Sequence, residues 1–155
     1  MGASVRELIE GVDLTGTGAC AAFSLRKTAR AVTQVYDAGL RETGVRSTQF
    51  TILVAIAKSQ PATVGALAKL TLMDPTTMTR NLRLLKSEGL VEVSPRGERR
   101  EKCVRLSKKG ERALARSVPV WRAMQSRFVA SFGERKWSEM RRELELLAAL
   151  AVERR

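Results

Sequence analysis

An arginine- and threonine-rich face of one predicted helix is the first candidate for chemistry in this sequence. Residues 75–88 predict the helix, because Asp74 can accept hydrogen bonds from its first backbone N–H groups and Pro75 suits its first position. At 100° per residue, one side of this helix is apolar and the opposite side is polar. The polar side and its flanks carry Thr76, Thr77, Thr79, Arg80 and Arg83.

These residue types are suited to the major groove of double-stranded DNA. Arginine can pair with the two acceptors of guanine, and threonine can bond a phosphate or contact the methyl group of thymine. A merely solvated helix face is the alternative, but such a face usually mixes charges, and this one has no acid before Glu88. The pattern therefore favours contact between these five residues and DNA.

Three further arginines, Arg96, Arg99 and Arg100, fall between two predicted strands at 90–94 and 102–106. Side chains at the tip of such a hairpin can reach a minor groove or its phosphates. Glu98 would repel DNA if it pointed outward, so we expect it to pair with one of these arginines. An exposed ion pair contributes at most about 1 kcal/mol, so its value would be orientation of the arginine.

The charge of the chain fits a polyanionic partner but does not by itself establish one. The 155 residues contain 28 Lys and Arg against 16 Asp and Glu, a net charge of +12. Residues 74–116 carry twelve basic and six acidic residues, so a net +6, half of the total, falls in this stretch. Nucleic acid is the obvious partner for such a stretch, although a solvated basic surface would have the same composition.

Enzymatic chemistry has little support in the sequence. The chain has no histidine, which removes the commonest general base, the commonest metal ligand and the histidine-assisted nucleophiles. It also has no phosphate-binding glycine motif and no CxxC pair. Catalysis by carboxylates or lysine stays open, but no residue pattern indicates it. We expect a protein that is not an enzyme and uses neither a metal nor a cofactor.

The elements around these residues predict a mainly α fold with a small two-stranded β wing, a winged helix-turn-helix. Apolar periodicity and capping residues indicate helices over 19–43, 48–58 and 64–70 before the helix at 75–88. The hairpin follows, and then long helices at about 108–132 and 134–153. Thr63 and Ser107 are the predicted caps of the third and fifth helices, Ser47 of the second. Leu67 and Leu70 are expected to be buried.

Domain organisation follows from where the apolar surface lies. Residues 46–106 can fold around their own core as the DNA-binding domain, and residues 1–18 are expected to be a flexible polar arm. The outer segments, 19–45 and 107–155, carry more apolar surface than so small a domain could cover. We therefore expect them to be dimerisation helices that form a two-fold homodimer, with packing inside one chain as the alternative.

From Cys20 onward the sequence resembles the MarR family of bacterial transcription regulators, most specifically in the segments 63–70, 74–89 and 90–110. In the wing, this family usually has Asp-x-Arg followed by Leu-Thr-x-x-Gly. The sequence has Glu98-Arg99-Arg100 and then Leu106-Ser107-Lys108-Lys109-Gly110, which are mild changes. The resemblance implies a dimeric regulator, usually a repressor, that binds pseudo-palindromic operators in double-stranded DNA. It also implies release by a small phenolic or lipophilic effector, or by oxidation.

Cys20 is the residue on which an oxidation-sensing alternative depends. Similar proteins that sense hydroperoxides have a reactive cysteine near the start of this helix, assisted by tyrosine hydroxyls. A helix N-terminus favours the thiolate of a cysteine, and Arg26 and Lys27 lie within two turns. However, Tyr36 is the only tyrosine, and Cys20 would equally suit a buried position. Cys103, in a predicted strand, is expected to be structural.

The remaining expectations concern the compartment and the competing functions. Two cysteines 83 positions apart form no disulfide framework, and no apolar run reaches the roughly 20 residues that span a bilayer. We therefore expect a cytoplasmic protein with no membrane partner.

Phe23, Phe50 and Trp121 are better interpreted as core residues than as an effector pocket. A non-specific architectural DNA-binding protein and a protein-binding winged helix are the alternatives to a regulator.

Overall fold

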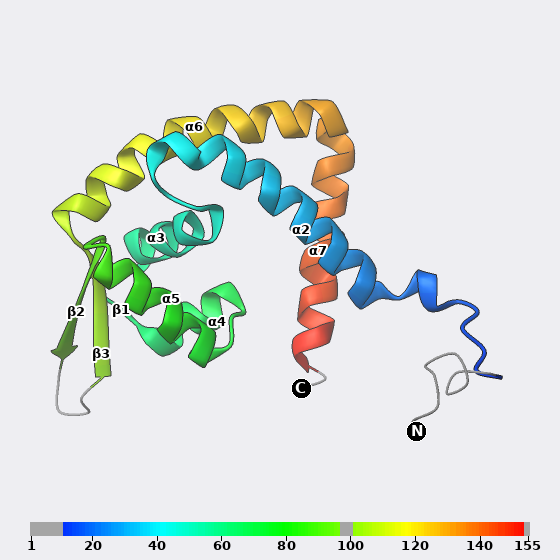
Figure 1. The fold of residues 1–155 in the computed structure, drawn as a ribbon, viewed down its shortest axis with the longest axis horizontal. Coiled ribbons are helices and arrows are strands. Elements are labelled where there is room, and N and C mark those ends of the chain that lie inside the picture. The colour runs from blue at the N-terminus through cyan, green and yellow to red at the C-terminus, as the bar shows by residue number, and fades with distance from the viewer. Residues whose placement is uncertain (1–10, 97–100, 154–155) are drawn as a thin grey trace, which may run out of the picture. The chain divides into compact units, whose positions relative to one another are not determined.

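The computed structural model describes residues 11–96 and 101–153, which form two compact units, 1–35 and 36–155. The described part of the first unit contains a 3-10 helix, η1 (Thr17–Ala19), and the larger part of α2 (Ala21–Leu40). The second unit contains the end of α2 and all later elements (Figure 1). These elements are η2 (Arg41–Thr43), α3 (Ser47–Ser59), β1 (Ala62–Thr63), α4 (Val64–Thr71), α5 (Pro75–Ser87), β2 (Val91–Arg96), β3 (Glu101–Leu106), α6 (Lys108–Phe132) and α7 (Glu134–Glu153).

Two of the predicted helix caps are present as expected. The hydroxyl of Thr63 accepts a hydrogen bond from the Ala66 N–H at 3.1 Å, and the hydroxyl of Ser107 accepts one from the Gly110 N–H at 3.0 Å. Each satisfies a backbone donor that the first turn of a helix leaves without an internal partner. The starts of α4 and α6 are therefore fixed by local sequence.

The predicted cap of α3 is wrong. Ser47 is the first residue of the helix, and its N–H donates to a carboxylate oxygen of Asp37, at 2.7 Å. The side-chain oxygen of Gln49 accepts from the Arg46 N–H at 2.9 Å. The first turn of α3 is thus satisfied by a residue ten positions earlier, at the end of α2, rather than by its own serine.

The sheet has three strands in the order β1-β3-β2, all antiparallel, so the predicted two-stranded wing gains a third strand at its base. Val91 lies opposite Leu106 and Arg96 opposite Glu101 in the β2–β3 hairpin. The short strand β1 places Ala62 opposite Val104. A two-residue strand has no periodicity of its own, which is why the sequence did not predict β1.

The core of the second unit lies where α3, α4 and α5 meet the sheet and the start of α6. Ile52, Leu53, Ile56 and Val104 are among its fully buried side chains. Leu67 is buried as predicted, but Leu70 is 60% exposed, contrary to prediction. Leu70 lies in the last turn of α4, beyond the buried pair Leu67 and Ala68, so helical spacing from Leu67 did not ensure that it is covered.

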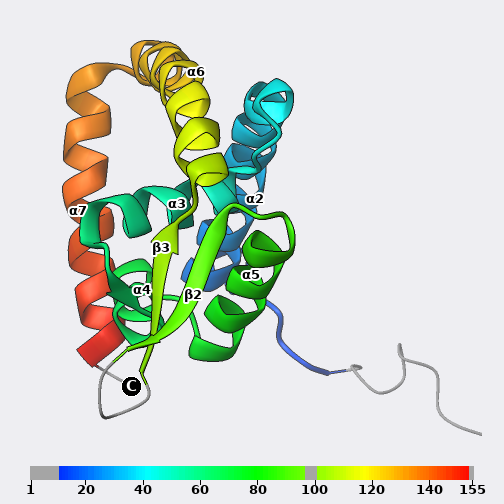
Figure 2. The same cartoon turned by 90° about the vertical axis from the view of Figure 1, so that its left-hand side faces the viewer.

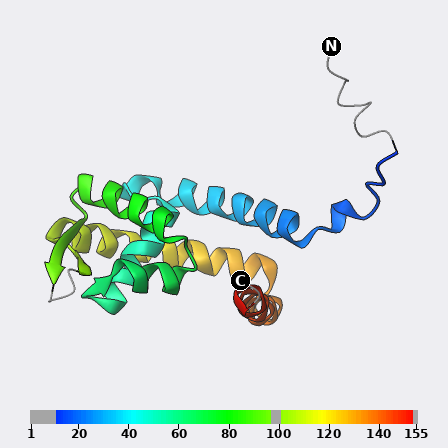
Figure 3. The same ribbon diagram turned by 90° about the horizontal axis from the view of Figure 1, so that it is seen from below.

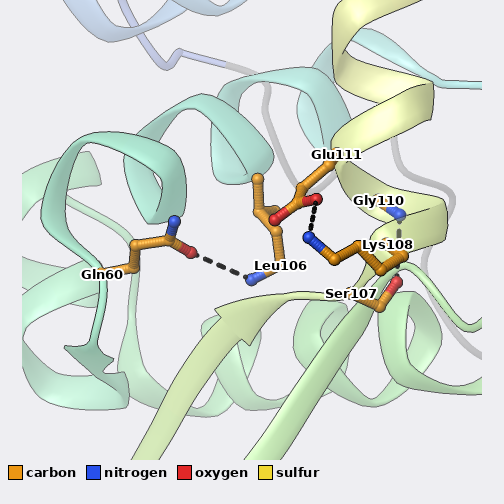
Figure 4. A network of polar contacts seen from close by, with 6 residues as sticks. All are labelled: Gln60, Leu106, Ser107, Lys108, Gly110 and Glu111. Carbon is orange, nitrogen blue, oxygen red and sulfur yellow. Dashed lines mark hydrogen bonds and ion pairs between the residues drawn. The ribbon is translucent and has the colours of Figure 1, made fainter.

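Helices α6 and α7 continue from the winged domain. Figure 4 shows the base of α6, where the Gln60 side chain accepts from the Leu106 N–H at 3.3 Å and Lys108 pairs with Glu111. Helix α6 then runs through Pro119 to Gly133, and α7 lies at the end of α6 that is remote from the sheet (Figure 3). No helix within the described ranges is long and apolar enough to cross a bilayer.

Candidate nucleic-acid interface

Helix α5 is held firmly at its first turn. A carboxylate oxygen of Asp74 accepts hydrogen bonds from the N–H groups of Thr76 and Thr77, at 2.8 and 3.2 Å, and Pro75 occupies the first helical position. Both features were predicted. At the other end, Gly89 adopts a φ of 71°, a left-handed conformation that glycine reaches without steric cost. The ends of α5 thus fix which residues it presents to solvent.

One face of α5 anchors the helix and the other is free. Met78, Leu82 and Leu85 are at most 4% exposed and pack into the core. On the other side, Thr76, Arg80 and Arg83 are exposed, whereas Thr77 and Thr79 are half-buried. The structure therefore brings the five predicted residues of α5 together along one side of a single helix, with three of them fully open to a partner.

The hydroxyl of Thr79 is already engaged within the helix. It donates to the carbonyl oxygen of Pro75 at 2.8 Å. A threonine hydroxyl has one hydrogen to donate, so Thr79 has its methyl group and its acceptor lone pairs left for a partner. Of the two contacts predicted for threonine, a hydrogen bond to phosphate or contact with a thymine methyl, this geometry leaves Thr79 free for the second.

The basic face of α5 has no acidic partner among the described residues. The three ion pairs within the described ranges all lie on α6 and α7. The first acid after the face, Glu88, is turned toward α3, where its carboxylate accepts from the Gln49 side chain at 2.8 Å. No carboxylate among the described residues therefore competes with an external anion for Arg80 and Arg83.

Comparison with known proteins identifies the family. A family model described as MarR family matches residues 43–101. A structure of the M. tuberculosis transcriptional regulator MosR in complex with DNA is 38% identical, covering 88% of this chain and 98% of that chain with a TM-score of 0.81. A second MosR structure is 36% identical, covering 85% and 95% with a TM-score of 0.74. No curated protein matches the sequence.

This chain belongs to the MarR family. It is a DNA-binding transcriptional regulator, and the family is not one of enzymes. The resemblance inferred from residues 63–110 is confirmed, as is the mainly helical winged helix-turn-helix fold. The structure of CouR from Rhodococcus jostii bound to p-coumaroyl-CoA is 19% identical, covers 86% of this chain and 95% of that chain, and has a TM-score of 0.70. At that identity the likeness concerns the fold alone.

Both strands of the wing of this MarR-family chain are described, but residues 97–100 between them are not. Arg96 is the last residue of β2, with the backbone of Glu101 opposite. Arg99, Arg100 and Glu98 lie outside the described residues. The structure adds two lysines that the sequence analysis did not single out, Lys86 on α5 and Lys102 on β3, which line one groove together with Arg83. Of the two, only Lys86 could have been found from the sequence, because it lies three residues after Arg83 and therefore on the same side of the helix.

Cys20 is exposed and free in the structure and stands immediately before α2. Its carbonyl oxygen accepts from the Ser24 N–H at 3.0 Å, so it occupies the N-terminal cap of that helix. Cys103 is also free, and it is buried in β3, as expected of a structural residue. The Tyr36 hydroxyl donates to the Gln125 side chain on α6, and burial raises the pKa of Tyr36. Tyr36 is thus already hydrogen-bonded within its own unit.

Aromatic side chains in the second unit pack against one another. The rings of Phe50 and Trp121 stack at a centroid distance of 5.7 Å, and Phe128 makes edge contacts with Tyr36 and Trp137 at 6.1 Å each. Phe50 and Trp121 therefore behave as core residues, as predicted, whereas Phe23 is 59% exposed, which contradicts its interpretation as core. No cluster of three potential metal ligands occurs among the residues that the structure describes.

Proposed function

We propose that this chain is a homodimeric, sequence-specific regulator whose helix α5 reads bases in the major groove of double-stranded DNA. Arg80, Arg83, Thr77 and Thr79 read bases, Thr76 contacts the backbone, and Arg96, Arg99 and Arg100 add contacts from the wing. The observation that carries the proposal is the exposed, acid-free basic face of α5 opposite a fully buried one. The second helix of such a motif lies in the major groove with its N-terminal residues at the base edges.

The proposed dimer is supported by apolar surface at the end of the chain. On α7, Met140, Leu144 and Leu147 are 39–41% exposed and recur at helical spacing on one side. A stripe of this kind is covered most simply by a second copy across a two-fold axis. We assign residues 46–106 to DNA binding and 19–45 and 107–155 to dimerisation, with 1–18 as an arm. The operator would then be pseudo-palindromic.

Repression and its relief rest on the family resemblance. A dimer bound to an operator near a promoter would exclude RNA polymerase. A phenolic or lipophilic effector in the cytoplasm would release the dimer from the operator. Effectors of this class act by binding one state of the dimer more tightly than the other, so their effect is limited by that difference in affinity.

Selection of bound duplexes from a random pool tests this proposal. We expect an enriched inverted repeat, and sedimentation should show one dimer on each selected duplex. Enrichment of no sequence, together with a steep salt dependence, would instead support non-specific architectural binding. Failure to shift any duplex at low salt would overturn DNA binding by this chain and leave a protein-binding module.

Exposure of Cys20 favours one second candidate, a repressor released by oxidation. Peroxide treatment of the wild type and of Cys20→Ser, followed by titration with the selected operator, separates the two. Effector-controlled repression predicts equal affinities for both proteins before and after treatment. Release of the wild type alone would assign the switch to Cys20.

A further inference from the structure

A groove of about 590 Å³ lies between α5 and the strands of the wing. Its floor is apolar, formed by Val64, Leu82 and Val93. Its walls carry three cations, Arg83 and Lys86 from α5 and Lys102 from β3. Figure 2 shows α5 and β2 side by side, with the hairpin extending along the helix.

The charge of this groove has one sign. No acidic residue is among the described residues that line it. Glu92, an acid of β2, instead lines a different recess together with Arg105 and Glu111. Because Glu92 lies opposite Arg105 in the hairpin register, the two share one face of the sheet. Lys102 is an odd number of residues from Arg105 on the same strand, so it lies on the other face. The sheet thus separates Glu92 from the groove.

The shape of duplex DNA indicates what this groove would meet. A helix fits the major groove, about 12 Å wide, and a hairpin tip reaches the minor groove, about 6 Å wide. Neighbouring major and minor grooves are separated by one sugar-phosphate strand. When α5 and the wing occupy adjacent grooves, that strand has to pass between them, over the walls that carry Lys86 and Lys102.

We propose that this groove holds one DNA backbone segment and that Lys86 and Lys102 contact its phosphates. The inference rests on the proposed placement of α5 in the major groove. Lysine binds phosphate as a point charge and reads no base, so these two residues contribute affinity and register rather than sequence preference. Phosphates held on both sides also fix how far α5 enters the groove.

Salt-dependent binding of Lys86→Gln and Lys102→Gln tests the inference. Because the proposed dimer carries two copies of each lysine, each variant should lower the slope of log affinity against log salt by about 1.8, which is about 0.9 for each phosphate contact that is lost. Each should also lose the same fold in affinity on the selected operator and on a random duplex, with the selected sequence unchanged. Arg142→Gln removes one positive charge outside the groove, on the side of α7 away from Met140, Leu144 and Leu147, and should keep the wild-type slope.

A scan with neutral methylphosphonates locates the contact. On the selected operator, the wild type should lose affinity at a phosphate flanking the recognised bases, and Lys102→Gln should lose markedly less at that position. Equal losses for both proteins at every phosphate would overturn the inference. So would an unchanged salt slope in both groove variants, or an altered base preference.

The test separates this inference from the proposed function. If the wild type selects a site but both groove variants keep its slope, only the groove assignment fails. If the wild type selects no site, the proposed function fails first. Circular dichroism of each variant should match the wild type, since both lysines are exposed and neither has an ion-pair partner within the described residues.

Discussion

At the residue scale, Gly110 shows how closely α6 approaches the wing. A Cβ atom at this position would lie 1.9 Å from the carbonyl oxygen of Leu90 and 3.0 Å from its carbon, both backbone atoms. We predict that Gly110→Ala lowers the free energy of unfolding by about 1–3 kcal/mol, because backbone has to move to admit the methyl group. Urea denaturation measures this loss.

Gly65→Ala is the matched control for that substitution. Gly65 also lies in the first turns of a helix, and a Cβ there meets nothing within 4 Å. The control should leave stability unchanged or raise it by up to about 1 kcal/mol, through the better helix propensity of alanine. Equal losses in the two variants would contradict the close approach at Gly110.

A second residue-scale prediction concerns the carboxylate that begins α3. Hydrogen bonds from the side chain and backbone of Ser47 lower the pKa of Asp37 below its ordinary value, with a smaller contribution from Arg46 and against a small opposing effect of burial. A lowered folded-state pKa means that the ionised carboxylate stabilises the fold above the unfolded pKa, near 4. That stability is lost as pH falls through the folded pKa.

Asp37→Asn separates the charge from the hydrogen bond, because asparagine can still accept from the Ser47 N–H. We expect the variant to be less stable than the wild type at pH 6 and the gap to shrink below about pH 4. Denaturation at both pH values measures the gap. A gap that stays constant from pH 6 to pH 3 would show that the charge of Asp37 has no role.

At the scale of elements, helix starts set by neighbouring residues could be predicted from the sequence, whereas features set by contacts between distant segments could not. The caps Thr63, Asp74 and Ser107 act within three residues, so they can be recognised in the sequence. Ser47 failed as a cap because its partner, Asp37, comes from another helix. Strand β1 was missed because it exists only through pairing with β3, some forty residues later.

The same distinction between local and long-range signals applies to the candidate site. The exposed side of α5 could be predicted from helical periodicity alone, since Met78, Leu82 and Leu85 mark the buried side. The groove did not, because Lys102 reaches the side of α5 only through the register of the hairpin. From the sequence alone, Lys102 cannot be distinguished from the other cations of its basic stretch, because its position beside α5 depends on how the strands pair.

The cap of α5 gives an element-scale prediction. Asp74→Ala removes the acceptor for two N–H groups at the start of the reading helix, and should lower stability by about 0.5–2 kcal/mol. Asp74→Asn keeps an acceptor and should lose less. Thermal or urea unfolding measures both. If alanine and asparagine cost the same, the carboxylate contributes by charge at the helix N-terminus rather than as a cap.

At the scale of the whole molecule, the proposed dimer depends on the exposed stripe of α7, Met140, Leu144 and Leu147. We predict that Leu147→Glu raises the dissociation constant of the dimer at least about tenfold, because the charge would have to be desolvated in the interface. Analytical ultracentrifugation over a concentration series measures this constant. Binding to an inverted repeat should weaken in parallel, because one protomer then holds only one half-site.

Ala149→Glu is the control for the dimer prediction. It introduces the same charge two residues further along, on the opposite side of α7, where the side chain is also exposed. Its dimer should dissociate like the wild type. If both variants dissociate equally, or neither does, the stripe containing Leu147 is not the dimer interface.

Binding of Arg80→Ala to two duplexes at one salt concentration shows whether α5 reads DNA sequence. If it does, the variant should lose about 1–3 kcal/mol on the selected operator and much less on a scrambled duplex of equal length. Arg122→Ala, an exposed arginine of α6, should bind both duplexes like the wild type. Equal losses of Arg80→Ala on the two duplexes, or no loss on either, would contradict the claim.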